Sequence, residues 1–296
     1  MVSTDTPCDV MVYAAQGNDG QHALRDVLPS EGKAFGAARP YLTEWTRDGS
    51  LLAREASAIW VEYDVPSKGA APDPFVFVCL YPDYLRKGYP HHAPIGRQDE
   101  ARVRATAKEG LRWALGKAPS RQQLDVITRC TRALPDDGRM LHVVGMPHRP
   151  GGALRIGAIL PYDDVPRWLQ QIDWSGTKPQ LKRMRKLFGG GYDYIHVQVE
   201  LSTHVHNRLA FDFNLSTTPA KNPRWKQFAG AVAAECDAEP EKLDAALAWV
   251  GSERLHFDDD PIPARLDRQL FFKVSSSPDQ LEAKAYLCFH PRYSLL

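Results

Sequence analysis

The chain has 296 residues, 25% of them charged, and its net charge is only +1. This balance gives no global attraction to nucleic acid or to an anionic membrane surface, and no apolar run approaches the roughly 18 residues that cross a bilayer. The N-terminal sequence MVSTDTPCDV lacks the basic and then apolar layout of a signal peptide. The five cysteines are widely spaced and never form CxxC, so we expect reduced thiols in a cytoplasmic protein.

Residues 1–55 are the least regular part of the sequence, where helical stretches are interrupted by Pro40 and by the Asp48-Gly49 pair. From residue 56 to the end, paired strand segments alternate with paired helical segments. The strand segments are rich in β-branched and aromatic residues and are joined by Pro/Gly/Ser loops, which is typical of hairpins. The expected hairpins are Ala58–Val65 with Phe75–Tyr81, Met140–Met146 with Leu154–Leu160, Tyr194–Leu201 with Arg208–Leu215, and Gln269–Val274 with Ala283–Phe289.

The helical segments carry apolar residues on one face, at spacings of three and four residues. Val165, Trp168, Leu169 and Ile172 show this pattern. The expected helices cover 101–115, 121–134, a segment from Asp164 onward, 181–188, a segment marked by Trp225, Phe228 and Val232, and a segment marked by Leu243, Ala246, Leu247 and Val250.

The strands carry polar residues on one face. Side chains alternate along a strand, so 194–201 places Tyr194, His196, Gln198 and Glu200 opposite an all-apolar face. The helices would cover the apolar face. The polar face then either meets solvent, as in many open antiparallel sheets, or lines the lumen of a closed barrel.

Two features favour the barrel. About eight strands are enough to close a sheet and remove its edges, and the polar face is rich in Arg, Lys, Glu, His and Tyr. We therefore predict an α+β fold, a polar-lumen antiparallel β-barrel ringed by helices, as a single domain over 1–296 with an irregular segment 1–55 and the repeats in 56–296.

Two short motifs resemble a known family. Lys284-Ala285-Tyr286 on the last strand has the form of a Lys-x-Tyr motif, and Trp60-Val61-Glu62-Tyr63 lies in the first hairpin. With the element order, they make the chain similar to the prenyltransferase-barrel (ABBA) family, the aromatic prenyltransferases of the dimethylallyltryptophan synthase type. That family is built from αββα repeats and has five hairpins; here a fifth would need a strand around Val10–Ala15.

The resemblance implies a donor site and an acceptor site. Glu62 would take up the proton of the aromatic ring. The diphosphate would be bound by lumen cations and a phenol, namely Arg155, Arg208, Lys273, Lys284 and Tyr286; alternatively, the cations pair with the lumen acids Glu62, Glu200 and Asp212. The substrate pocket would be lined by Trp60, Tyr81, His142, Tyr194, His196, Gln198 and Phe271.

The resulting hypothesis is an enzyme that transfers a prenyl group from an allylic diphosphate to an indole, a tryptophan or a peptide side chain. It predicts an enzyme that needs no cofactor, binds no metal and does not require Mg²⁺. The expected partners are a prenyl diphosphate and an aromatic small molecule or peptide. No nucleic acid or membrane partner is expected, and the protein is expected to be a monomer. Two alternatives stay open. One is a barrel enzyme with acid/base or cysteine chemistry at Glu62, His142, His196 and Cys288, and the other is a non-catalytic module that binds a ligand in the lumen. The pair His204 and His206 could also hold a metal.

Overall fold

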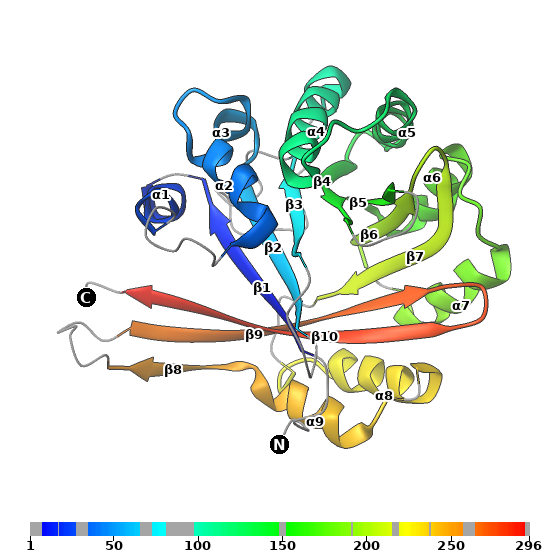
Figure 1. The fold of residues 1–296 in the computed structure, drawn as a ribbon. Helices are drawn as coiled ribbons and strands as arrows, with labels where there is room; N and C mark the ends of the chain where they lie inside the picture. The colour runs from blue at the N-terminus through cyan, green and yellow to red at the C-terminus, as the bar shows by residue number, and fades with distance from the viewer. Residues whose placement is uncertain are drawn as a thin grey trace. The chain divides into compact units, whose positions relative to one another are not determined.

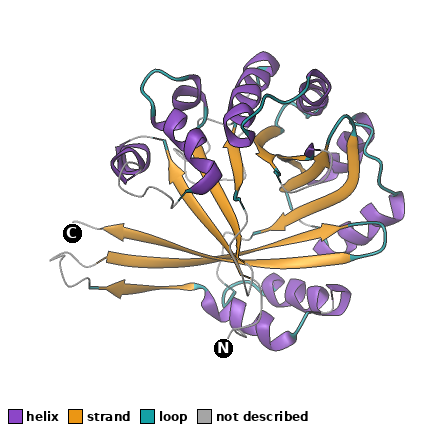
Figure 2. Ribbon diagram, viewed as in Figure 1, coloured by secondary structure: helices purple, strands orange, loops and turns teal. Residues whose placement is uncertain are grey.

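The computed structural model describes residues 8–16, 18–27, 35–65, 73–80, 98–147, 152–190, 192–214, 219–236, 238–256 and 264–293 (Figure 1). Its contacts divide the chain into two compact units. Unit 1 comprises residues 1–175 and 192–207, and unit 2 comprises 176–191 and 208–296. Each unit combines a sheet with helices (Figure 2). The expected single domain is not tested by this division and stays a prediction.

Unit 1 contains an antiparallel sheet in which neighbours in sequence are neighbours in space, in the order β1-β2-β3-β4-β5-β6. Its strands are β1 (Cys8–Ala15), β2 (Ala58–Val65), β3 (Phe75–Cys79), β4 (Arg139–Gly145), β5 (Leu154–Pro161) and β6 (Tyr194–Leu201). β1 pairs with β2 along its whole length, from Cys8 opposite Val65 to Ala15 opposite Ala58. The strand considered around Val10–Ala15 is therefore present, and it completes the first group of strands.

In unit 1, side-chain caps mark the start of some of the described α-helices. The α-helices are α1 (Ala23–Val27), α2 (Arg39–Thr46), α3 (Leu51–Glu55), α4 (Glu100–Leu115), α5 (Arg121–Arg132) and α6 (Val165–Gln171). Asp99 accepts hydrogen bonds from two backbone N–H groups at the start of α4, and Ser120 with Gln123 forms a capping box at α5. Gly116 ends α4 in the left-handed conformation that glycine tolerates best.

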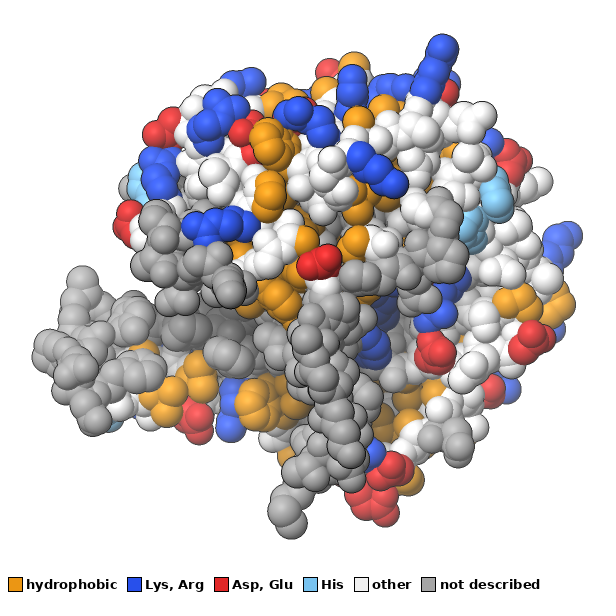
Figure 3. All heavy atoms as spheres, viewed as in Figure 1, with side chains coloured by type: hydrophobic (Ala, Val, Ile, Leu, Met, Phe, Trp, Pro, Cys, Tyr) orange, Lys and Arg blue, Asp and Glu red, His pale blue; other side chains and the backbone are white. Residues whose placement is uncertain are grey.

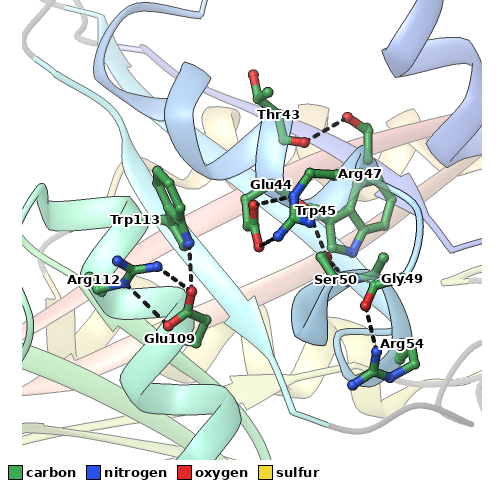
Figure 4. Close-up of polar contacts among 12 residues, drawn as sticks. Thr43, Glu44, Trp45, Arg47, Gly49, Ser50, Arg54, Glu109, Arg112 and Trp113 are labelled. Carbon is green, nitrogen blue, oxygen red and sulfur yellow. Dashed lines mark hydrogen bonds and ion pairs between the residues drawn. The ribbon is translucent and has the colours of Figure 1, made fainter.

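Polar contacts hold α2, α3 and α4 locally (Figure 4). The carboxylate of Glu44, which is mostly buried, accepts two hydrogen bonds from Arg47, and Ser50 caps α3 while its hydroxyl donates to the Glu44 carbonyl. On α4, Glu109 accepts hydrogen bonds from Arg112 and from the indole of Trp113. On the face of unit 1 turned to the viewer in Figure 3, basic and acidic side chains are interspersed with apolar ones.

Unit 2 is organised around one long strand. β9 (Ala264–Ser276) pairs along its whole length with β10 (Leu281–Tyr293). Its other edge is shared, because β8 (Gly251–Leu255) pairs with residues 264–268 and β7 (Val205–Phe213) pairs with residues 272–276. The helices are α7 (Lys178–Phe188), α8 (Arg224–Cys236) and α9 (Pro240–Trp249).

The aromatic core of unit 2 lies between its sheet and its helices. Phe213 of β7 stacks on Phe228 of α8 with ring centroids 3.7 Å apart, and Trp225 lies edge-on to Phe213 at 5.2 Å. Phe272 of β9 contacts Phe228 at 5.5 Å. Trp225 and Phe228 are residues that the apolar periodicity marked, so the amphipathic pattern correctly predicted the core-facing side of α8.

The structure adds to the expected elements in two places. β8 follows α9 directly and was not expected, because its sequence GSERL is polar and short. Phe75–Tyr81 ends as a strand at Cys79, and Tyr81 lies outside the described residues. The hydrogen bonds between the described strands do not close the strand order into a ring, so barrel closure stays a prediction. Within the described ranges, every helix is too short or too polar to cross a lipid bilayer.

Candidate active site

Among the described residues of unit 1, α4 packs on one face of the sheet, and the candidate residues lie on the opposite face. A Cβ added to Gly110 of α4 would lie 2.4 Å from the Val78 side chain, so α4 packs closely on that side of β3. Phe77 points to the opposite side because successive side chains alternate. Trp60 and Val144 are opposite Phe77 in register and share its side. We call this side the helix-free face of unit 1.

A row of rings follows this face. The centroid distances are 6.2 Å from Tyr13 to Trp60, 5.7 Å from Trp60 to Phe77, 5.1 Å from Phe77 to His142 and 5.2 Å from His142 to His196. Among the described residues, the indole N–H of Trp60 is buried without a hydrogen-bond partner. A buried donor of this kind is unusual, and it is available to a polar group of a bound molecule.

The two histidines of this row meet above a glycine. His142 and His196 are 1% and 5% exposed, and their rings are nearly perpendicular, at 88°. A Cβ added to Gly157 would lie 2.3 Å from Nε2 of His142 and 2.6 Å from Nε2 of His196. Gln198 lies opposite Gly157 on the next strand and is also buried. The absence of a side chain at residue 157 therefore makes room for both imidazoles.

Glu62 lies on the same face, two residues along β2 from Trp60, and is 3% exposed. Its neighbours across the strands are Met11 and Phe75, which pack against an apolar cluster that includes Phe77. Burying a carboxylate is costly unless other groups compensate its charge. The predicted catalytic base is thus buried beside the ring row.

Arg155 and Glu200 form an ion pair on this face. They are opposite each other on β5 and β6, the Arg155 Nη2–Glu200 Oε1 distance is 3.3 Å, and each side chain is 12% exposed. Tyr194 donates a hydrogen bond of 2.9 Å to Asp137, and burial, followed by that hydrogen bond, raises the pKa of the phenol. For Arg155, the structure agrees with the alternative hypothesis, in which a cation of the polar face pairs with an acid, here Glu200.

The helix-free face of unit 2 is the side of β9 that carries Phe271 and Lys273, because Phe272 faces α8. Lys273 lies opposite Asp212 of β7 and opposite Lys284 of β10. Phe271 lies opposite Tyr286, and their rings are stacked with centroids 4.4 Å apart and planes 3° apart. Two lysines and one aspartate therefore sit in adjacent registers next to an aromatic pair.

Arg208 lies on the same face of unit 2, on β7, four residues before Asp212. Its guanidinium donates 2.5 Å to Glu282 and 3.1 Å to Ser275. The Glu282 contact shows that this candidate cation already has an acidic partner. The two lysines lie side by side on β9 and β10, and Asp212 lies next to Lys273 on β7.

The two smaller candidate chemistries receive little support. Burial raises the pKa of the Cys288 thiol to about 11, which keeps it protonated and poorly nucleophilic at neutral pH. In the turn after β6, the Ser202 hydroxyl lies 2.8 Å from Nε2 of His206, whose ring is 4.7 Å from that of His204. Burial, and then His204, lowers the pKa of His206. The described part of the chain contains no group of three or more His, Cys, Asp or Glu arranged to hold a metal.

The predicted residues thus fall into two groups. Trp60, Glu62, His142, Arg155, Tyr194, His196 and Gln198 lie on the helix-free face of unit 1, and Arg208, Phe271, Lys273, Lys284 and Tyr286 lie on that of unit 2. Sequence reasoning missed Phe77 and Gly157. A lone glycine inside a strand is a recognised sign of close approach by another group, and Gly157 gave that signal.

Comparison with known proteins identifies a similar fold. No protein-family profile matches the chain, and no curated protein sequence matches it significantly. The solved structure of AnaPT from Neosartorya fischeri is similar over 96% of this chain and 78% of its own, with a TM-score of 0.53 and 13% sequence identity. AnaPT is an aromatic prenyltransferase with the ABBA fold. The resemblance that the sequence motifs indicated is confirmed at the level of the fold.

Proposed function

We propose that this protein is an aromatic prenyltransferase, which moves a prenyl group from an allylic diphosphate to an aromatic acceptor such as an indole, a tryptophan or a peptide side chain. The observation that carries the proposal is the burial of Glu62 beside a continuous row of rings on one helix-free face, in a fold similar to that of AnaPT. The proposed reaction needs no metal.

The acceptor side of the proposal rests on unit 1. Rings of Trp60, Phe77 and His142 offer flat surfaces for an aromatic acceptor and stabilise a nearby carbocation through their π faces. Such a site must also exclude water, which would quench the cation. We assign Glu62, which is buried beside these rings, to orient the acceptor and receive its proton.

The donor side rests on unit 2. Lys273, Lys284 and Tyr286 lie on one face and supply ammonium groups and a phenol, which bind phosphate oxygens electrostatically. We assign Arg208 a lesser part because Glu282 already neutralises it. Arg155, paired with Glu200, is assigned to shaping the face of unit 1.

The chemistry follows from these groups. The C–O bond of the prenyl diphosphate breaks and both electrons leave with pyrophosphate, whose charge the lysines stabilise. The π electrons of the acceptor then form the new C–C bond to the allyl cation. The resulting arenium ion loses its ring proton to the Glu62 carboxylate, and aromaticity returns.

The direct test is to incubate the full chain with dimethylallyl diphosphate and L-tryptophan in the presence of EDTA, and to measure pyrophosphate release together with product mass. We expect pyrophosphate release that depends on the acceptor, and a product heavier by one dimethylallyl group. Geranyl and farnesyl diphosphates and a tryptophan-containing peptide extend the assay. If no prenyl diphosphate binds even at millimolar concentration, the proposal is wrong.

A further inference from the structure

Helix α7 of unit 2 is strongly basic. Its eleven residues, KPQLKRMRKLF, contain five cations and no acid, whereas the whole chain has 37 basic and 36 acidic residues. The neighbouring α8 adds Arg224 and Lys226 and contributes one acid, Glu235. α7 packs against α8 (Figure 1), so positive charge is concentrated here rather than spread over the chain.

Three of these cations form a row. Lys178, Lys182 and Lys186 are exposed and separated by four residues, so they lie on one side of the helix, roughly 6 Å apart along its axis. We call them the lysine row. The opposite side of α7 is buried, with Met184 and Phe188 among its buried residues. The row is thus the outward face of a helix whose other face belongs to the core.

The fold does not require the row. α7 begins with a capping box between Thr177 and Gln180, and the Gln180 amide donates 2.9 Å to the carbonyl of Ser276. Phe188 contacts Phe211 and Phe228, each with ring centroids 5.3 Å away. Caps and packing therefore hold the helix, while like charges four residues apart oppose it.

Little acid lies close to the row. Lys186 is 3.7 Å from Glu235, and its side chain is 80% exposed. Within the described residues, Lys178 and Lys182 form no ion pair. At the C-terminal end of α7, the Arg224 guanidinium donates 2.8 Å to the Gly190 carbonyl and adds a further cation nearby. The surface therefore attracts an anionic partner.

The class of partner is narrowed by features that the exposed side of α7 does not have. Its apolar face is buried, so it cannot insert into a bilayer as an amphipathic surface helix does. Its one aromatic residue, Phe188, is also buried, so it offers no stacking platform for single-stranded nucleic acid. The net charge of +1 is far from the basic balance of duplex-binding domains. These three observations favour a polypeptide.

We infer that the lysine row docks an extended acidic segment of another polypeptide. Alternate side chains of an extended chain project to one side about 7 Å apart, close to the roughly 6 Å rise along the helix between successive lysines of the row. A segment with Asp or Glu at alternate positions would place one carboxylate near each of Lys178, Lys182 and Lys186. This docking is independent of the proposed prenyl transfer.

The test uses the full chain and a fluorescent peptide with three glutamates at alternate positions, read by anisotropy. The variant K178Q/K182Q/K186Q is compared with K108Q/K117Q/K242Q, which removes the same number of exposed lysines elsewhere. We expect the first variant to bind about tenfold more weakly and the second to change less than about twofold. Binding should weaken with added salt and should be lost when the glutamates are replaced by glutamine.

Three results would overturn the inference. Equal losses in both variants would show unspecific charge attraction. Tighter, row-dependent binding of a single-stranded oligonucleotide or of phosphatidylserine vesicles at physiological salt would assign the row to another class of partner. The thermal unfolding midpoint of K178Q/K182Q/K186Q should equal or exceed that of the unaltered chain, since repulsion is relieved; a clear drop would assign the lysines a structural role.

Discussion

The imidazole rings of His142 and His196 lie at 88° with their centroids 5.2 Å apart, and both Nε2 atoms approach the position that a Cβ of Gly157 would occupy. The two histidines come from strands more than fifty residues apart, and both are buried. The packing of β4, β5 and β6 on this face therefore depends on the absence of a side chain at residue 157. The contact links the packing of the sheet to the arrangement of the proposed acceptor site.

Gly157→Ala is expected to destabilise unit 1. The added methyl group would lie 2.3 Å from His142 Nε2, so at least one imidazole must move, and overpacking of this kind costs about 1–3 kcal/mol. Urea unfolding measures the loss. Gly230→Ala on α8 is the matched control, because a Cβ there has no atom within 4 Å and alanine is the better helix former by about 1 kcal/mol. Equal stability of the two variants would contradict the close approach.

Glu62→Gln is expected to lower the turnover of the proposed prenyl transfer by about a hundredfold or more, because the amide cannot accept the ring proton. Size and hydrogen-bonding capacity are nearly kept, so the unfolding midpoint should change little. Glu241→Gln, at an exposed position of α9, makes the same substitution away from the site and should leave turnover unaltered. Acceptor-dependent product formation at an undiminished rate in Glu62→Gln would remove Glu62 from the reaction.

Lys284→Ala is expected to raise the KM for the prenyl diphosphate by about tenfold, since a charged hydrogen bond to phosphate is lost. Arg208→Ala should raise it less, because Arg208 is already bound to Glu282. Lys242→Ala, at an exposed position of α9, serves as the control. Steady-state kinetics with varied diphosphate at saturating acceptor separates KM from kcat. A larger effect for Arg208 than for Lys284 would reverse the assignment.

The buried thiols predict that stability falls at alkaline pH. Burial raises the thiol pKa from 9.0 to about 12 in Cys79 and Cys130, and to about 11 in Cys236 and Cys288. Because the thiol pKa is higher in the folded than in the unfolded protein, the protonated thiols contribute fully to the free energy of unfolding below about pH 9. This contribution is lost as the pH rises through the folded-state thiol pKa values. Urea midpoints should therefore be flat from about pH 7 to 9 and decline above it.

The same shift predicts that Cys288 is slow to react. At neutral pH, iodoacetamide should modify it far more slowly than it modifies free glutathione, because only the thiolate attacks. Cys288→Ala should retain any prenyl transfer activity. Rapid alkylation together with loss of activity in Cys288→Ala would instead favour the cysteine-enzyme alternative.

Much of the fold could be predicted from local pattern. Ala58–Val65 and Tyr194–Leu201 are strands with the expected bounds, because alternation and β-branched content are local properties of the sequence. β8 was missed because a short polar segment gains its strand conformation only by pairing with β9. The alternation of side chains along each strand was enough to predict that His196, Gln198 and Glu62 lie on the polar face.

The sequence by itself determined which residues alternate onto the polar face of each strand, since the two-residue period of a strand is fixed by backbone geometry. It also determined the helix starts at Asp99 and Ser120, which depend on neighbouring residues only. Only the tertiary structure determined which side chains of different strands contact one another. The pairing of Arg155 with Glu200, the stacking of Phe271 on Tyr286 and the seating of two imidazoles above Gly157 depend on strand register. Register is set by which face of a strand is buried and by turn geometry, and the alternation of side chains along a single strand does not fix it.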